Sequence, residues 1–169
     1  MSAIPRAERS HPAASPRRLA AEYATARVLA ESPALKDATP RILEAICQTL
    51  GWEHAALWQA DLQAGVLRCV EVWHVPGTAF PEFQDLSRRT TFARDVGLPG
   101  RVWAGGRPAF IPDVLRDANF PRAAAAAREG LHAAFAFPIM LGPEVLGVME
   151  FFSRQIREPD AELLTMLDT

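Results

Sequence analysis

One acidic side chain stands in a strand-like stretch that is otherwise apolar. Glu150 lies between Met149 and Phe151, and apolar residues continue on both sides. A carboxylate buried among such neighbours must be paired with a cation, hydrogen-bonded or protonated. We therefore interpret Glu150 in two ways. It is either a pocket carboxylate that recognises a donor on a ligand, or a structural residue. As a structural residue it would be the partner of an arginine or a helix N-terminus, or it would be exposed by a bend in the strand, and such a role is the more common one.

A second carboxylate follows a short apolar run. Asp113 comes after Ala109–Ile111 and the turn residue Pro112. An aspartate in this position either caps the next short helix or points into a pocket at the strand end. Capping is the more common role. Trp103 lies in a short segment flanked by glycines, a setting suited to a lid, although a tryptophan is more often part of the core.

Histidine and cysteine offer little metal chemistry in this sequence. No two of the four histidines have i, i+4 spacing and none adjoins a cysteine, so no structural zinc site is expected. His74 and His132 fall at strand ends, which leaves a haem or redox sensor as an alternative. Cys47 and Cys69 each sit in an apolar pattern and are interpreted as small hydrophobic residues.

Common catalytic motifs are missing. The sequence has no Gly-x-Ser-x-Gly elbow, no GxxxxGK[ST] loop and no GxGxxG fingerprint. Pro99, in Gly97–Gly100, removes an amide that a phosphate cradle would use. The chain is therefore predicted to be non-catalytic, with no catalytic or metal-binding residues.

Length and composition limit the partners. The chain has 169 residues, a formal net charge of -2 and 49% hydrophobic residues. This allows one domain with a core, and the slightly acidic balance argues against nucleic-acid binding. The longest apolar run, residues 133–141, contains Pro138 and is too short for a membrane span. With no apolar leader segment at the N-terminus, a cytoplasmic location is expected.

The elements that must position these residues alternate between helical and strand patterns. Residues 1–16 are predicted to be a disordered tail, and a helix follows from Arg17. A second helix is expected to begin at Thr39–Pro40 and to stop at Gly51. Further helical segments are predicted at 80–89, 97–103 and 123–127, the last capped by Asn119, and from 158 onward.

Strands are predicted at 54–59, 66–75, 109–111, 133–141 and 145–153. Because hairpins join most of them, the sheet should be antiparallel and the fold class α+β. In the fourth strand, Phe135 and Phe137 share one face and Ala134 and Ala136 the other. Both faces are apolar, so both must be covered, and the alanines imply the close approach of a helix or a ligand.

Three segments together resemble a known family. The runs GLPGRVWAGGRPAFIPDV, NFPRAAAAAREGLHAAFAFPI and EVLGVMEFFSR, with PRILEAICQTLGWEHAALWQAD upstream, resemble GAF domains, in particular those of bacterial sensor histidine kinases. The resemblance covers residues 17–169. It implies an antiparallel sheet of about five or six strands, with terminal helices on one face and short helices and loops over a pocket on the other.

The departures from this family are informative. The Asn-Lys…Phe…Asp-Glu signature of cyclic-nucleotide-binding GAF domains is incomplete, because Asn119-Phe120 lacks the lysine and the final acidic pair. The segment 122–132 has no cysteine, which argues against a thioether-linked bilin. Cys47 and Cys69 do not match the pattern of GAF-type methionine sulfoxide reductases. The cofactor, if there is one, stays unknown.

The resemblance thus implies a sensory or regulatory module of a signal-transduction protein, a histidine kinase. Such a module would bind a small molecule, form a homodimer through its terminal helices, or both, and an output helix cut off at Thr169 would lead to a downstream effector domain. The alternatives are a structural dimerisation domain with a filled pocket, a haem or redox sensor, and an enzyme of the sulfoxide-reductase kind. The candidate pocket residues are Trp103, Ile111, Asp113, Phe120, Phe135, Phe137 and Glu150.

Overall fold

The computed structural model describes residues 35–159, 161, 163 and 165. The predicted tail and the helix predicted from Arg17 lie outside these residues. In chain order the elements are α2 (Leu35–Leu50), β1 (His54–Asp61), β2 (Val66–His74), α3 (Pro81–Arg89), β3 (Thr91–Phe92), α4 (Gly97–Gly105), β4 (Ala109–Ile111), the 3₁₀ helix η1 (Val114–Arg116), α5 (Ala123–Glu129), β5 (Ala133–Leu141) and β6 (Glu144–Ser153).

Six strands form one antiparallel sheet in the order β3-β2-β1-β6-β5-β4. The predicted α+β class and antiparallel topology are confirmed. The strands expected at 109–111 and 133–141 have the predicted bounds. β3 was not predicted, because a two-residue strand is too short to show an alternating pattern.

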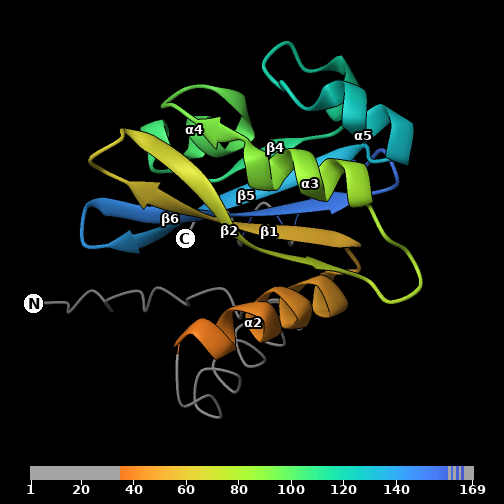
Figure 1. Ribbon diagram of the computed structural model, residues 1–169. Coiled ribbons are helices and arrows are strands. Elements are labelled where there is room, and N and C mark those ends of the chain that lie inside the picture. Colours follow the sequence, from red (N-terminus) through yellow and green to blue (C-terminus); the bar gives the residue numbers. More distant parts are fainter. Residues whose placement is uncertain (1–34, 160, 162, 164, 166–169) are drawn as a thin grey trace, which may run out of the picture.

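The sheet is covered on both faces, as the apolar strands required. Helix α2 lies against one face, whereas α3, α4 and α5 lie over the other (Figure 1). Each face has its own core cluster. The α2-side cluster contains Leu43, Ile46, Trp52, Phe135 and Phe151, and the described part of the C-terminal segment adds Leu163.

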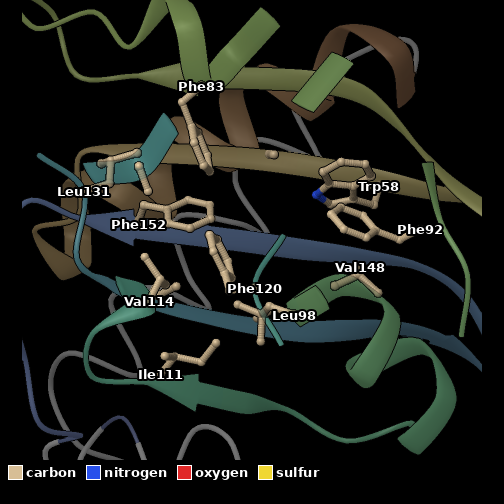
Figure 2. Packing of buried hydrophobic residues seen from close by; sticks show 14 of the residues in the cluster. Trp58, Phe83, Phe92, Leu98, Ile111, Val114, Phe120, Leu131, Val148 and Phe152 are labelled. Atoms are coloured by element: carbon tan, nitrogen blue, oxygen red, sulfur yellow. The ribbon is translucent and has the colours of Figure 1, made fainter. Parts of the chain in front are cut away.

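The cluster beneath α3, α4 and α5, here called the inner cluster, is rich in aromatic rings (Figure 2). It includes Ala134 and Ala136 together with Leu98 and Val102 of α4. The close approach implied by the two alanines is therefore made by a helix. Small side chains at these strand positions let α4 pack directly on the sheet.

Helix α2 begins earlier than predicted. It starts at Leu35, and Pro40 lies inside it rather than at its first position. Proline at this position lacks the N–H that would bond to the preceding turn, so the helix loses one backbone hydrogen bond. The buried apolar stripe of Ile42, Leu43 and Ile46 against the sheet stabilises the helix despite this loss. None of the helices in the described part of the chain is long and apolar enough to cross a membrane.

Candidate functional site

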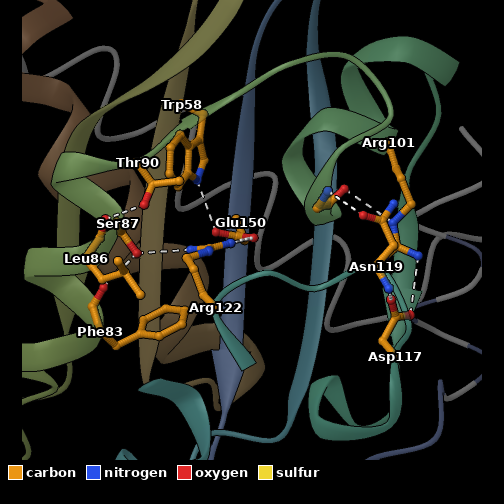
Figure 3. A network of polar contacts seen from close by, with 11 residues as sticks. Trp58, Phe83, Leu86, Ser87, Thr90, Arg101, Asp117, Asn119, Arg122 and Glu150 are labelled. Carbon is orange, nitrogen blue, oxygen red and sulfur yellow. Dashed lines mark hydrogen bonds and ion pairs between the residues drawn. The ribbon is translucent and has the colours of Figure 1, made fainter. Parts of the chain in front are cut away.

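An ion pair is buried between the sheet and the helices above it. Nη2 of Arg122 lies 2.6 Å from Oε2 of Glu150, and the two side chains are 1% and 0% exposed. The other carboxylate oxygen accepts a hydrogen bond from the indole Nε1 of Trp58 at 3.0 Å. Nη1 of Arg122 donates to the hydroxyl of Ser87 at 3.0 Å. Figure 3 shows the guanidinium held between Ser87 of α3 and Glu150 of β6.

Aromatic rings surround the same guanidinium. Its Cζ lies 4.9–5.6 Å from the centroids of five rings, which belong to Trp58, Phe83, Phe92, Phe120 and Phe152. A cation at this distance from a ring face is attracted by the ring quadrupole, most strongly where water is excluded. The cation therefore gains from the rings as well as from Glu150, which offsets part of the desolvation cost of burying an ion pair.

A histidine is buried beside this cluster without polar partners. His54 of β1 is fully buried, and neither ring nitrogen has a hydrogen-bond partner among the described residues. The rings of Phe80, Phe83 and Phe152 lie 5.5–5.7 Å from it. Burial, and then the nearby positive charge of Arg122, lowers the pKa of His54 to about 3. The imidazole is therefore neutral at physiological pH.

The segment before α5 brings Arg122 into the site. Arg122 is the residue immediately before the alanine-rich α5, and Gly130, in the left-handed conformation, ends that helix. Helix α5 is tied to α3 at its far end, where the carboxylate of Glu129 accepts the backbone N–H groups of Glu82 and Phe83 at 2.8 Å. Arg122 and Glu129 thus join α5 to α3 at both ends.

Asn119 does not cap α5 as predicted. Its side-chain oxygen accepts the N–H of Gly97 at 2.9 Å, and its amide nitrogen donates to the carbonyl of Asp95 at 2.8 Å. Asn119 therefore holds the start of α4 rather than that of α5. A capping residue lies next to its helix in sequence, whereas Asn119 bonds to a segment more than twenty residues away, which local pattern reasoning does not detect.

Asp113 caps η1 as expected, accepting the N–H of Leu115 at 3.1 Å. The same oxygen lies 3.1 Å from Nδ1 of His132, and the other carboxylate oxygen lies 3.9 Å from Nε of Arg116. Asp113 also lines an open cavity of about 360 Å³ together with Ile111, Arg116, Asp117, Ile156 and Glu158. Asp113 therefore caps η1 and also lines a cavity.

The structure brings together only some of the candidate pocket residues. Trp103, Ile111 and Phe120 belong to the inner cluster, on the face of the sheet that carries Glu150. Phe135 and Phe137 lie on the opposite face, in the α2-side cluster. These two residues do not lie with Glu150 as the pocket prediction required.

A β-bulge explains where Phe135 and Phe137 lie. Next to the turn between β5 and β6, Leu141 pairs with Glu144 and Met140 pairs with Val145. If this register continued without a shift, Phe135 would lie opposite Glu150. The register shifts between Ile139 and Met140, so that Ala136 pairs with Glu150 instead. Residues paired across strands share a face, and a shift of one residue exchanges the faces.

Sequence reasoning missed Arg122, Trp58 and His54. Glu150 was recognised as a carboxylate that needs a cation, a hydrogen bond or a proton, but an arginine beside an alanine-rich helix has the pattern of a solvated surface residue. The one available indication was that an arginine was among the partners open to Glu150.

The cysteines lie on opposite faces of the sheet. Cys47 is part of the α2-side cluster, whereas Cys69 packs against the inner cluster. Burial raises the pKa of both thiols, to about 11 for Cys69. Among the described residues, no group of three or more His, Cys, Asp and Glu side chains is placed to hold a metal ion.

Solved structures with this fold include several GAF domains and two methionine sulfoxide reductases. The GAF domain of nlh2 from A. aeolicus is 21% identical, with a TM-score of 0.68, and the match covers 90% of this chain and 86% of that one. The free methionine-R-sulfoxide reductase of Neisseria meningitidis, solved with its substrate, is 14% identical with a TM-score of 0.68 and coverages of 90% and 82%. A domain of a Sinorhizobium meliloti protein described as a two-component sensor histidine kinase is 20% identical with a TM-score of 0.57 and coverages of 80% and 83%.

These identities are low enough that the likeness establishes the fold alone. A comparison with curated proteins found no match. A family model described as "GAF domain" matches residues 32–169, which is most of the chain. Regulation and sensing are the general roles of this family, although its fold also serves a reductase. The chain belongs to the GAF domain family.

Proposed function

We propose that this GAF domain is the non-catalytic sensory module of a cytoplasmic signal-transduction protein, a sensor histidine kinase. A small molecule that enters the space between the sheet and helices α3, α4 and α5 would regulate it, and the terminal helices would form the homodimer. The likeness to a domain described as part of a sensor histidine kinase supports the choice of parent protein. The arrangement around Arg122 supports the choice of site.

The observation that carries this proposal is a set of buried polar groups with unused hydrogen-bonding capacity. Nε of Arg122 and both ring nitrogens of His54 are buried without a partner among the described residues. Buried polar atoms are nearly always paired, and leaving one unpaired costs free energy. A ligand with complementary groups would recover that free energy, whereas an ordinary apolar core has no such capacity.

The coupling would proceed by a population shift. A ligand stabilises whichever state it binds more tightly, and it moves the equilibrium by its difference in affinity for the two states. Here the site contacts Ser87 of α3 and Arg122 beside α5. A change at Arg122 would therefore alter the packing of two helices that lie over the sheet.

A ligand screen by thermal unfolding, combined with light scattering, tests this proposal. A ligand at about 100 times its dissociation constant stabilises the folded state by about 2.7 kcal/mol. For a domain of this size that corresponds to a rise in melting temperature of about 5–10 °C. A chain that is monomeric at all concentrations and is stabilised by no compound of a broad metabolite library would contradict the sensory role.

A second function is favoured by one observation. Both carboxylate oxygens of Glu150 are already bonded, one to Trp58 and one to Arg122. A domain whose interior is filled in this way could act as a structural dimerisation module. In that case light scattering would find a dimer while the screen found no ligand, and substitutions at Arg122 would change stability without creating a binding site.

A further inference from the structure

The guanidinium of Arg122 occupies an enclosure, here called the cation box, that has the chemistry of a receptor for an organic cation. The box consists of the five rings around the guanidinium and the two polar side chains that bond to it, Glu150 and Ser87. Aromatic rings around a cation are a known means of recognising cationic ligands. The enclosure excludes water almost completely, since Arg122 is 1% exposed.

The polar end of the cation box is held in place without help from Arg122. The indole of Trp58 fixes one oxygen of Glu150 and leaves the other free to accept from the cation at 2.6 Å. The hydroxyl of Ser87 donates to the carbonyl of Phe83 at 2.8 Å, so its lone pairs face the guanidinium. Carboxylate and hydroxyl oxygens arranged in this way select a planar cation that carries several N–H donors.

The occupant and most of the box come from different parts of the fold. Trp58 and Glu150 belong to the sheet, and Ser87 belongs to α3, whereas Arg122 enters from the segment before α5. Both polar partners and four of the five rings come from other elements, and Phe120 belongs to the same segment as Arg122. Nε of Arg122 remains unpartnered among the described residues, so the tethered guanidinium uses only part of its donor capacity.

We propose that the cation box is a recognition site for small molecules bearing a guanidinium group, and that Arg122 is its built-in competitor. This inference rests on the proposed sensory function and names the ligand class of the same site. A guanidinium ligand takes the place of the Arg122 side chain against Glu150, Ser87 and the five rings. Arg122 then leaves the box, and the start of α5 moves with it.

Displacement of Arg122 has a defined structural consequence. Helix α5 is anchored to α3 by Arg122 at one end and by Glu129 at the other. Loss of the Arg122 contact frees one end of α5 while Glu129 still holds the other. The ligand would thereby convert a helix fixed at both ends into one fixed at a single end.

The test uses the full 169-residue chain with Arg122→Ala and methylguanidinium as the probe. We expect saturable one-to-one binding to the variant, with a rise in melting temperature and a change in tryptophan fluorescence from Trp58. Wild type should bind at least about tenfold more weakly, because its own guanidinium is present at a high effective concentration. Methylurea, which is neutral and of similar shape, should bind neither protein.

Two controls separate the box from a general salt or surface effect. Arg101→Ala removes a partly buried arginine that pairs with Asp117 outside the cation box, and this variant should respond to methylguanidinium as wild type does. Adding Glu150→Gln to Arg122→Ala should abolish the binding. Equal responses of wild type and Arg122→Ala, or binding that survives loss of the carboxylate, would overturn the proposal.

Arg122→Met, which fills more of the box, is the second variant in case Arg122→Ala does not fold alone. Recovery of the native circular dichroism spectrum of Arg122→Ala on addition of methylguanidinium would support the proposal. A lack of recovery, with no binding advantage of Arg122→Met over wild type, would reject it. Binding to Arg122→Ala with no response of wild type to methylguanidinium would reject the proposal, because the ligand must take the place of Arg122. A wild-type response to methylguanidinium, when the screen finds no ligand, would retain the box and reject the sensory role. A neutral or anionic ligand that stabilises wild type would support the sensory role and reject the cation box as its ligand site.

Discussion

The carboxylate of Glu129 accepts the backbone N–H of Phe83 at 2.8 Å, across an interface between two helices that are far apart in sequence. Its second oxygen accepts the N–H of Glu82 at the same distance. The first N–H groups of a helix have no partner within it, so α3 receives a cap from α5 rather than from its own flanking residue. The side chain of Glu129 therefore caps α3 from another helix, and this contact joins α3 to α5 above the cation box.

Replacement of Glu129 by alanine should destabilise the domain by about 1 kcal/mol, the usual cost of losing a helix cap. Both N–H groups at the start of α3 would lose their acceptor. Urea unfolding at neutral pH measures the change. As a control, Glu82→Ala removes only the exposed ion pair with Arg128 and should have a smaller effect. Equal losses for the two variants would mean that the cap contributes nothing beyond surface charge.

Glu150→Gln should destabilise the domain by about 3–5 kcal/mol, because it leaves the cation of Arg122 buried without its counter-charge. The double variant Arg122→Met/Glu150→Leu should lose much less, since an apolar pair can replace a buried ion pair. A double-mutant cycle in urea with the single variants Arg122→Met and Glu150→Leu measures this, and the sum of their two effects should exceed the effect of the double change.

Asp117→Asn provides the matched control for the buried pair. Asp117 pairs with Arg101 at 3.3 Å, and these side chains are 18% and 31% exposed. Solvent screens this pair, so its loss should cost less than that of Glu150→Gln. A larger loss at Asp117 would contradict the central role of the Arg122–Glu150 pair.

His54→Phe should remove part of the acid sensitivity of the domain. The pKa of His54 is about 3 in the folded state, and the ordinary value of 6.5 applies on unfolding. Between these values the unfolded chain binds one more proton, so stability falls as the pH is lowered from 6.5, by up to about 1.4 kcal/mol per pH unit. Above pH 6.5, His54 does not make the stability of the domain depend on pH.

Urea unfolding of wild type and His54→Phe at pH 7, 6, 5 and 4.5 tests this expected loss of stability at low pH. The stability difference between His54→Phe and wild type should grow steadily in favour of the variant as the pH falls. Groups common to both proteins cancel in this difference. A constant difference across the range would show that the imidazole of His54 takes up its proton equally well in the folded state.

Alanine substitutions at two glycines of α4 should have opposite effects on the stability of the domain. A Cβ at Gly100 would collide with the carbonyl oxygen of Ala93, whereas a Cβ at Gly105 has nothing within 4 Å. Gly100→Ala should cost about 1–3 kcal/mol, because the obstructing atom belongs to the backbone. Gly105→Ala should stabilise the domain by about 0.4–1 kcal/mol by restricting the unfolded chain. Thermal unfolding of the two variants beside wild type measures both changes in stability.

Strand pattern and turn residues were sufficient to predict most of the fold. The apolar runs at 109–111 and 133–141 became β4 and β5 with the predicted bounds. These elements are encoded locally, by side-chain alternation and by glycine or proline at their ends. The start of α2 was predicted too late, because proline at the first helical position is a statistical preference that the packed stripe of α2 overrides.

The site was only half predictable, and the bulge in the pairing of β5 with β6 shows why. Glu150 could be found because a carboxylate in an apolar strand is unusual. The faces taken by Phe135 and Phe137 depend on a one-residue shift between Ile139 and Met140, and both faces are apolar. Arg122 comes from a loop whose position depends on tertiary packing. No local pattern contains that information.

Neither thiol should support sulfoxide reduction, although a methionine sulfoxide reductase shares the fold. The thiolate is the reactive form, and burial raises the pKa of Cys69 to about 11 and that of Cys47 further. At pH 8 only about one thousandth of Cys69 would be ionised. The sheet also separates the two residues, since they pack in clusters on opposite faces.

Labelling with a disulfide reagent at pH 8 should therefore be slow in the native chain and fast in urea. The native chain should not reduce free methionine sulfoxide with a thiol reductant. The Cys47→Ser/Cys69→Ser variant is the control, and it should behave as wild type in the reductase assay. Rapid labelling of one native thiol, together with reductase activity that this double variant lacks, would contradict the prediction and reassign the domain to the enzymes of this fold.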